Sequence, residues 1–250
     1  KMDSSKIRVS QSEMGGGFGG KTSFYGEPLA AILSKKAKRP VKIVLTRNEV
    51  FRCTGPVSGT HSKIKIGCTN DGRITAAEAE LYFQTGAFTG SMFFNAPQAM
   101  FTRYALDNIK TISWEVVSNR PKVNAFRAPC VPQIVFGVEH IISELAHKVG
   151  MDPIDFRLKN AMKEGDTSIY GQTFGPIGFV ETLEAAKACD HYQSPVPEGQ
   201  GRGLAAGFWF NRGGDTTGSL TITPDGSVTI MLGTSDVAGS RISISMMAAE

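Results

Sequence analysis

A glycine-rich loop near the N-terminus constrains this chain more than any other feature. Residues 15–20 hold five glycines around one phenylalanine, Phe18, and Lys21 and Thr22 follow directly. Glycine permits left-handed backbone angles and lets a backbone approach another molecule closely. The segment satisfies both G-x-G-x-x-G and the phosphate-loop pattern G-x-x-x-x-G-K-[ST]. Residues 7–10 predict a strand before the loop and residues 29–33 a helix after it, which is the context that both patterns require.

One interpretation is therefore a phosphate-binding loop, in which backbone N–H groups hold an anion and Lys21 adds positive charge. Phosphate-loop proteins need alternating parallel strands and helices, and a strand that ends in an acidic residue for Mg²⁺. Here residues 41–45 predict a strand that ends at Thr46 and Arg47, hairpins dominate beyond it, and Asp236 is the one weak acidic candidate. The context disfavours nucleotide hydrolysis, which stays as the alternative function.

The rest of the chain predicts an α+β fold with mixed sheets, hairpins and packed helices. The turn Asn70-Asp71-Gly72 between residues 63–66 and 73–83 is typical of a hairpin. Further strands are predicted at residues 111–117 and in a second hairpin, 219–223 with 228–232. Apolar spacing and capping residues predict helices over residues 133–149, 152–162, 179–188 and 242–250. Residues 84–108 support no assignment.

The domain organisation is predicted from one polar stretch with two prolines, residues 193–201, which is interpreted as a linker. It divides a first domain, residues 1–192, from the beginning of a second domain, residues 202–250. Predicted elements begin and end almost at the two termini, so we expect the chain to be a fragment of a longer protein.

Composition excludes several classes of function. The net charge is only +4, from 27 basic and 23 acidic residues, and the basic residues are scattered, so nothing indicates a nucleic-acid partner. No apolar stretch approaches the roughly 18 residues that span a bilayer, and no signal peptide is evident. The four cysteines and four histidines lack the spacing of a zinc or iron–sulfur site. Free thiols suggest a cytoplasmic location.

Several segments resemble the molybdopterin-binding subunit of the xanthine dehydrogenase/aldehyde oxidase family. The glycine loop, residues 14–21, is similar to the GGFGGK loop of that family, and Arg47-Asn48-Glu49 to its RNE segment. Three further similarities follow in the family's order, and these are Asn124-Ala125-Phe126-Arg127-Ala128-Pro129, Leu158-Lys159-Asn160 with Glu164-Gly165-Asp166, and Arg202-Gly203 with Gly233-Thr234-Ser235-Asp236. One glycine loop is weak support, but five ordered segments are strong support, and they favour this family over a phosphate-loop protein.

The resemblance implies a molybdopterin cofactor, in the plain or the cytosine dinucleotide form, that carries molybdenum. It implies that Phe18 lies beside the metal through its backbone and that the Arg127 guanidinium supports the negatively charged oxygen ligands of the metal. Without the resemblance, Phe18 reads as a buried hydrophobe and Arg127 as part of a surface ion pair. The implied cofactor-binding positions are Gly16, Gly17, Phe18, Gly19, Arg127, Asp236 and Gly239.

Departures from the family pattern bear on the substrate. Purine-oxidising members carry a glutamate where this chain has Thr22, and an aromatic residue where it has Pro129, although Arg47 is retained as a polar anchor. Carbon monoxide oxidisers carry a cysteine where this chain has Ala128. The expected reaction is therefore hydroxylation of an aromatic N-heterocycle or oxidation of an aldehyde, with xanthine disfavoured. Residues 208–210, Phe-Trp-Phe, fit either a substrate pocket or core packing.

Partners are implied by the same resemblance. Electrons in this family leave through [2Fe–2S] clusters and usually FAD, which we expect on other domains or subunits. The remainder of its own molybdopterin-binding subunit is a further expected partner, since the family's late glutamate base has no counterpart in these residues. The chain alone is therefore expected to be inactive.

Overall fold

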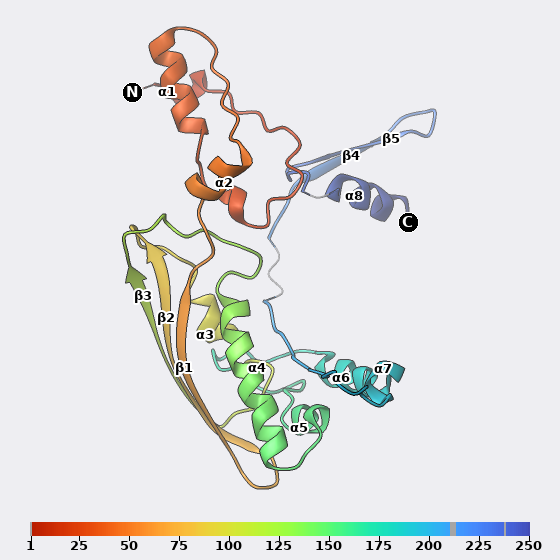
Figure 1. Ribbon diagram of the computed structural model, residues 1–250. Coiled ribbons are helices and arrows are strands. Elements are labelled where there is room, and N and C mark those ends of the chain that lie inside the picture. The colour runs from red at the N-terminus through yellow and green to blue at the C-terminus, as the bar shows by residue number, and fades with distance from the viewer. Residues whose placement is uncertain (1, 211–213, 238) are drawn as a thin grey trace. The chain divides into compact units, whose positions relative to one another are not determined.

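The computed structural model describes residues 2–210, 214–237 and 239–250 (Figure 1). Its contacts divide the chain into two compact units. The larger unit is Ser23–Phe210, and the smaller unit joins the two ends of the chain, Lys1–Thr22 and Asn211–Glu250.

The larger unit contains one sheet and seven of the helices found in the described residues. Its strands are β1 (Thr60–Cys68), β2 (Ile74–Gly86) and β3 (Asn108–Val117). Its helices are α1 (Glu27–Ala37), α2 (Arg47–Cys53), α3 (Asn95–Ala99), α4 (Val131–Lys148), α5 (Pro153–Lys159), α6 (Phe179–Ala188) and α7 (Asp190–Gln193).

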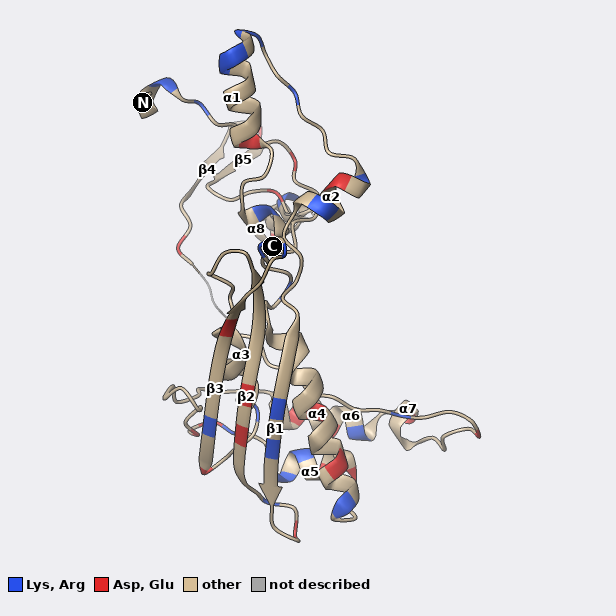
Figure 2. Ribbon diagram, turned by 60° about the vertical axis from the view of Figure 1, so that its left-hand side comes forward, with Lys and Arg blue, Asp and Glu red and all other residues tan. Residues whose placement is uncertain are grey.

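The sheet has the order β1-β2-β3, with β1 antiparallel and β3 parallel to β2. The predicted hairpin is confirmed. Gly72 adopts a φ of 85°, which favours glycine, and its N–H donates to Thr69 O at 2.9 Å to close the turn. One face of the sheet carries charges in facing rows, with Lys63–Glu80 at 3.5 Å and Lys110–Glu78 at 3.1 Å (Figure 2).

The hydrophobic core lies between the other face of the sheet and α4, which runs across it (Figure 1). Apolar residues four positions apart share one side of a helix, and Ile134, Val138 and Ile142 of α4 are all fully buried. They meet Leu81 and Phe83, which alternate with polar residues along β2 and are also fully buried. The predicted helix over residues 133–149 is confirmed.

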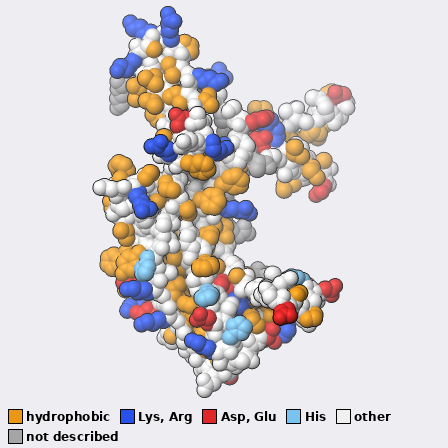
Figure 3. All heavy atoms as spheres, viewed as in Figure 1, with side chains coloured by type: hydrophobic (Ala, Val, Ile, Leu, Met, Phe, Trp, Pro, Cys, Tyr) orange, Lys and Arg blue, Asp and Glu red, His pale blue; other side chains and the backbone are white. Residues whose placement is uncertain are grey.

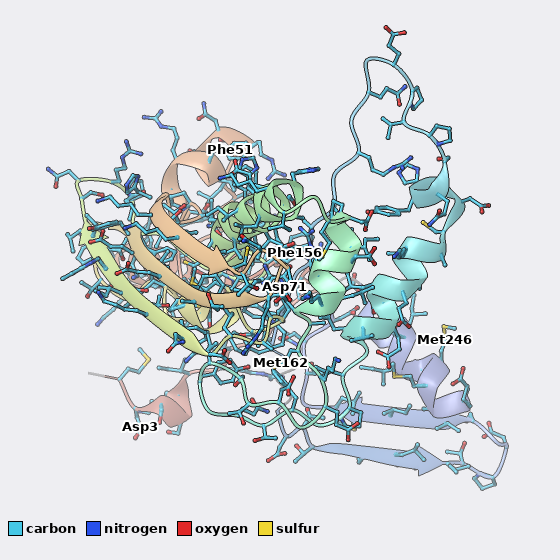
Figure 4. The ribbon with its side chains drawn as sticks, turned by 90° about the horizontal axis from the view of Figure 1, so that it is seen from below. Asp3, Phe51, Asp71, Phe156, Met162 and Met246 are labelled. Carbon is cyan, nitrogen blue, oxygen red and sulfur yellow. The ribbon has the colours of Figure 1, made fainter. Side chains whose placement is uncertain are left out.

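Helix α5 is fixed to the sheet by its last turn. Asp152 caps its start by accepting hydrogen bonds from the N–H groups of Ile154 and Asp155, as its Asp-Pro sequence predicts. Asn160 at its end accepts from Ile74 N at 2.8 Å and donates to Gly72 O at 2.8 Å. Phe156 of α5 is fully buried in the core, near the turn that carries Asp71 (Figure 4).

The segment that carries α1 and α2 buries no residue. Helix α2 begins with a capping box, in which Thr46 and Glu49 exchange side-chain and backbone hydrogen bonds. The apolar residues Leu29 and Ile32 of α1 are 53% and 58% exposed, and hydrophobic side chains are visible over α1 in Figure 3. The predicted helix at residues 29–33 is confirmed, but its apolar side meets no core.

The smaller unit contains the antiparallel hairpin β4 (Gly218–Ile222) and β5 (Val228–Leu232), followed by α8 (Ser240–Ala249). All three match the predicted elements. Asp225 closes the hairpin turn by accepting hydrogen bonds from Thr223 and Ser227, and these bonds lower its pKa to about 2.

Two predicted strands are wrong. Residues 7–10 and 41–45 are extended but pair with no other strand in the described residues. Val9 is 89% exposed and Val44 is 73% exposed, so neither β-branched run finds a surface to cover. A β-branched run becomes a strand only where neighbours complete its ladder and bury one side.

The predicted linker, residues 193–201, falls inside the larger unit rather than between the two units. Arg202 donates to Tyr192 O at 2.6 Å and to Ser194 O at 2.7 Å, so this stretch folds back on α7. The division between units instead falls at Thr22 and again at Phe210.

Candidate functional site

The glycine loop forms a tight, exposed turn within the smaller unit. Gly15, Phe18 and Gly19 all adopt positive φ angles, of 61°, 51° and 94°. Phe18 is 60% exposed, so it is not a buried hydrophobe. A Cβ atom at Gly16 would lie 2.4 Å from Cε2 of Phe18, so a side chain there would have to displace the exposed Phe18 ring. The positive φ angles of Gly15 and Gly19 favour glycine, and the loop presents both backbone and an aromatic ring at its surface.

Lys21 and Thr22 serve the loop itself. The Lys21 ammonium donates to Met14 O, across the base of the loop, and the Thr22 hydroxyl donates to Gly19 O at 2.8 Å. The segment that follows is a single 3₁₀ turn, Gly20–Thr22, and α1 begins only at Glu27. A phosphate loop needs a strand before it and a helix directly after it, and this loop has neither. The phosphate-loop interpretation is therefore rejected.

Asp236 and Gly239 lie where β5 leads into α8. The Asp236 carboxylate accepts from Ser240 Oγ and Arg241 N, both at 3.1 Å, and the bond from the Arg241 N–H lowers the pKa of Asp236. Gly239 has a φ of 86° at the start of the helix. Asp236 thus organises the first turn of α8 and also borders a cavity of about 260 Å³, together with Gln11, Ser235, Ser240, Arg241 and Ser245.

Hydrogen bonds join this turn to the segment that leads into the glycine loop. Ser235 Oγ donates to Gln11 Oε1 at 2.8 Å, and Arg241 Nη1 lies 3.5 Å from Glu13 Oε1. The predicted cofactor-binding residues 16–19, 236 and 239 therefore belong to one unit, although they are far apart in sequence.

Arg127 lies in the larger unit, on a strained loop that leads into α4. Ala128 and Cys130 have φ angles of 57° and 67°, which non-glycine residues rarely adopt. Val131 N donates to Ala128 O at 3.1 Å and closes the turn. Arg127 is exposed, and no carboxylate within the described residues forms an ion pair with it. The surface ion pair considered for Arg127 is thus not found, and its guanidinium is available to an anionic ligand.

The two other substrate-related predictions in this unit differ in setting. Pro129 is half-buried beside Arg127, whereas Arg47 is exposed at the first turn of α2. None of the contacts in the described residues joins Arg47 to the Arg127 loop. Cys130 is 4% exposed, and burial raises the pKa of its thiol to about 11. A protonated, buried thiol of this kind is a packing residue and a poor metal ligand.

An aromatic cluster packs beside the Arg127 loop. Phe210 forms a small core with Ala99 and Val131, and Ala128 and Phe208 pack against it. The rings of Phe208 and Phe210 stand edge to face at 5.4 Å, a favourable geometry for aromatic pairs. Residues 208–210 therefore contribute to packing, and their position places aromatic rings next to the predicted site.

Asn95 was missed by the sequence analysis. It lies in α3 one turn before Ala99 and hence on the same side of the helix. It is 3% exposed, and its Oδ1 atom makes no hydrogen bond with any described residue, as is also true of the hydroxyl oxygens of Ser91, Thr111 and Ser113. Buried amide oxygens are almost always paired, so a water or another polar group would complete the hydrogen bonding of Asn95. Its only sequence signal was a polar residue within an apolar, unassigned stretch.

Neither a protein-ligated metal site nor a membrane helix is present among the described residues. No group of three or more His, Cys, Asp or Glu side chains is close enough to hold a metal ion there. No helix in the same residues is long and apolar enough to cross a bilayer.

Comparison with known proteins gives a family match. Residues 1–161 match the family described as the molybdopterin cofactor-binding domain. The nicotinate dehydrogenase large molybdopterin subunit of Eubacterium barkeri is 34% identical over 190 residues, which cover 74% of this chain and 45% of that protein. The xanthine dehydrogenase molybdenum-binding subunit of Escherichia coli O157:H7 is 28% identical over 98% of this chain and 35% of its own length.

Solved structures agree in fold. The aldehyde oxidoreductase of Desulfovibrio gigas superimposes with a TM-score of 0.72 and 26% identity over 87% of this chain and 25% of its own. Quinoline 2-oxidoreductase of Pseudomonas putida 86 superimposes with a TM-score of 0.67 and 23% identity, over 70% of this chain and 24% of its own. This chain thus spans less than half the length of each of these proteins.

Proposed function

Because this chain belongs to the molybdopterin cofactor-binding domain family, we propose that it forms part of the molybdenum-binding subunit of an oxidoreductase. The whole enzyme would hydroxylate an aromatic N-heterocycle or oxidise an aldehyde. The observation that carries this proposal is the glycine loop, in which the positive φ angles of Gly15, Phe18 and Gly19 present an exposed backbone surface. Such a surface suits close approach of a flat pterin.

The chain's own residues would bind and orient this cofactor. Gly16, Gly17, Phe18 and Gly19 would contact it through their backbone, and the unpaired guanidinium of Arg127 would hold negatively charged oxygen atoms. The turn at Asp236 and Gly239 would offer further backbone contacts. When bound, molybdopterin with molybdenum supplies the two-electron oxidation chemistry, so the protein need only position the reactants.

Substrate choice follows from which polar groups remain. Threonine has no carboxylate to hydrogen-bond a purine, and the Thr22 hydroxyl donates to Gly19 O. Pro129 supplies no aromatic ring. A site that lacks the carboxylate that hydrogen-bonds a purine discriminates against purines. We expect an aromatic N-heterocycle or an aldehyde to be preferred over xanthine.

The remaining components would lie outside these residues. We propose that the pterin has the plain or the cytosine dinucleotide form, and that [2Fe–2S] clusters and FAD lie on other domains or subunits. The remainder of the same subunit would be a further partner, and the enzyme would act in the cytoplasm.

Two glycine variants of the full-length subunit test the cofactor assignment. Gly19→Ala places a side chain at a φ of 94°, which side chains rarely adopt, whereas Gly20 has no positive φ and nothing lies within 4 Å of a Cβ atom there. We expect Gly19→Ala to lose most of its bound molybdenum, measured by elemental analysis after purification, and Gly20→Ala to retain it. Equal metal content in both variants would contradict the assigned binding surface.

The substrate is tested separately, by steady-state assays of the intact enzyme. Purines, nicotinate-like acids, neutral N-heterocycles and aldehydes would be compared by kcat/KM. Xanthine as the best substrate would reject the substrate assignment without affecting the cofactor assignment.

A further inference from the structure

Glu139 of α4 is buried at the centre of a hydrogen-bonded cluster. Its side chain is 3% exposed, and its two oxygens accept six hydrogen bonds. Oε1 accepts from Nε and Nη2 of Arg103, at 3.0 and 2.5 Å, and from the Tyr104 hydroxyl at 2.7 Å. Oε2 accepts from Nε and Nη2 of Arg157, at 3.1 and 2.9 Å, and from Ala206 N at 2.7 Å.

The partners of Glu139 come from three separate segments. Arg103 and Tyr104 follow α3, Arg157 lies in α5, and Ala206 lies in an extended segment near the end of the larger unit. Arg103 and Arg157 are themselves 2% exposed or less. The carboxylate is therefore a point at which all three segments are hydrogen-bonded to α4.

The extended segment depends on this cluster for its backbone position. Residues 203–209 form neither helix nor strand. Among the described residues their backbone has two hydrogen bonds, and both involve the cluster: Ala206 N to Glu139 Oε2, and Arg157 Nη2 to Leu204 O at 3.1 Å. Without a ladder of its own, the segment is held by these two backbone hydrogen bonds and by the packing of Leu204, Phe208 and Phe210.

The same segment carries the aromatic residues beside the Arg127 loop. Phe208 lies two residues after Ala206, and Phe210 packs with Ala99 and Val131 at the start of α4. Trp209 lies between them in sequence, 44% exposed, with its ring 5.5 Å from that of Phe210. We call residues 208–210 the aromatic wall.

We propose that Glu139 is a positioning residue for the candidate site, because its buried carboxylate fixes the aromatic wall beside the Arg127 loop through the Ala206 N–H. Two arginines suffice to neutralise the carboxylate, so the bond from Ala206 is not needed to compensate its charge. What that bond does is fix the backbone of a segment whose other described contacts are made by side chains, among them Leu204 and Phe208. The role of the wall in substrate binding rests on the proposed function; its attachment to Glu139 does not.

A proline scan separates attachment from simple stabilisation. Ala206→Pro deletes the N–H donor but leaves Glu139, Arg103 and Arg157 intact. Ala205→Pro is the matched control, because Ala205 is exposed and its N–H makes no hydrogen bond in the described residues. Both changes are made in the full-length subunit, each with and without Trp209→Phe, so that the emission of Trp209 is obtained as the difference between the two.

The first readout is Trp209 fluorescence, which requires no turnover. We expect Ala206→Pro to shift its emission to longer wavelength and to increase its quenching by acrylamide, and Ala205→Pro to do neither. Glu139→Gln, which places an amide donor against other donors, should produce the same change as Ala206→Pro. Equal emission in the two proline variants would overturn the proposal. Thermal unfolding is measured alongside, and if Ala206→Pro does not fold, Glu139→Gln at a temperature below its transition decides the question.

The second readout is the division between KM and kcat for the best substrate. We expect Ala206→Pro to raise KM about tenfold, with kcat and molybdenum content within about twofold of the control, because the wall is displaced while the cofactor is not. A shifted emission with unchanged KM would overturn the placement of the wall in the site. An enzyme that turns over none of the tested substrates even in the unmodified form would instead contradict the proposed function.

Discussion

The two parts of the chain that carry predicted site residues are stabilised differently. Every described hydrophobic side chain that is buried lies between Ile74 and Phe210, whereas residues 2–57 and 214–250 bury none. Arg127 is placed by the first region, because its loop leads directly into α4 and the core. The glycine loop belongs to the second region, where hydrogen bonds from Lys21 and Thr22 hold the turn.

This difference separates two ways of preparing a binding surface. A core holds side chains in place because any displacement opens a cavity or exposes apolar area. Exposed hydrogen bonds exchange readily with water and hold a loop less tightly, so the glycine loop should complete its order when a ligand covers it. Substitutions in the two regions should therefore differ in their effect on stability and on the site.

The largest expected effect compares two phenylalanines. Phe156 is fully buried between α5 and the sheet, and Phe51 of α2 is 78% exposed. We expect Phe156→Ala to lower the free energy of unfolding by about 3–5 kcal/mol, from lost burial and a new cavity. Phe51→Ala should change it by less than about 0.5 kcal/mol. Urea denaturation of both variants measures this. Similar losses would mean that residues 23–57 are covered by a core of their own.

A second prediction concerns Glu139 and acid. Burial alone would raise the pKa of Glu139, but the guanidiniums of Arg103 and Arg157 outweigh burial and hold it below the ordinary value of 4.5. A lowered folded-state pKa means that the stabilisation is complete above about pH 4.5 and is lost as the pH falls further. We expect Glu139→Gln to cost about 3 kcal/mol at neutral pH, because two buried guanidiniums lose their counter-charge.

The control for this prediction lies on the same helix. Glu144 is 53% exposed and meets His140 Nε2 at 3.3 Å, a surface pair worth about 1 kcal/mol or less. Denaturation of the wild type, Glu139→Gln and Glu144→Gln between neutral and acid pH should show a steep acid loss in the wild type and in Glu144→Gln only. An unchanged acid profile in Glu139→Gln would assign the acid sensitivity to other carboxylates.

The sequence predicted the features that depend on local contacts, and it did not predict those that depend on contacts between distant residues. The hairpin at Gly72 and helix α4 were predicted because a turn residue and an apolar repeat act within a few positions. The strands expected at residues 7–10 and 41–45 were wrong, because strand formation depends on partners that the local pattern does not contain.

The candidate site divides in the same way. The glycine loop and Arg127 were predicted as site residues from short motifs, and positive φ angles occur in the glycine loop and at Ala128, next to Arg127. Asn95 and Glu139 were not predicted, since their significance lies in what surrounds them in space. Asn95 is notable for a missing partner, and Glu139 for partners as distant in sequence as Ala206. Their residue types in isolation indicate neither.

The smallest expected effect concerns Arg127 itself, in the intact enzyme. If the core holds Arg127 in place so that its planar guanidinium supports anionic oxygen atoms, Arg127→Lys keeps the charge but loses the fork geometry. We expect kcat to fall about tenfold, which corresponds to about 1.4 kcal/mol, while KM changes by less than about twofold. Arg52 of α2 is also exposed and lies in the region without a core, so Arg52→Lys is the matched control and should leave both constants unchanged. Molybdenum content is measured in both variants, because a loss of cofactor would lower kcat for a different reason. If Arg127→Lys behaves like Arg52→Lys in kcat and in metal content, Arg127 is an ordinary surface residue, and the contrast between the two regions has no consequence for catalysis.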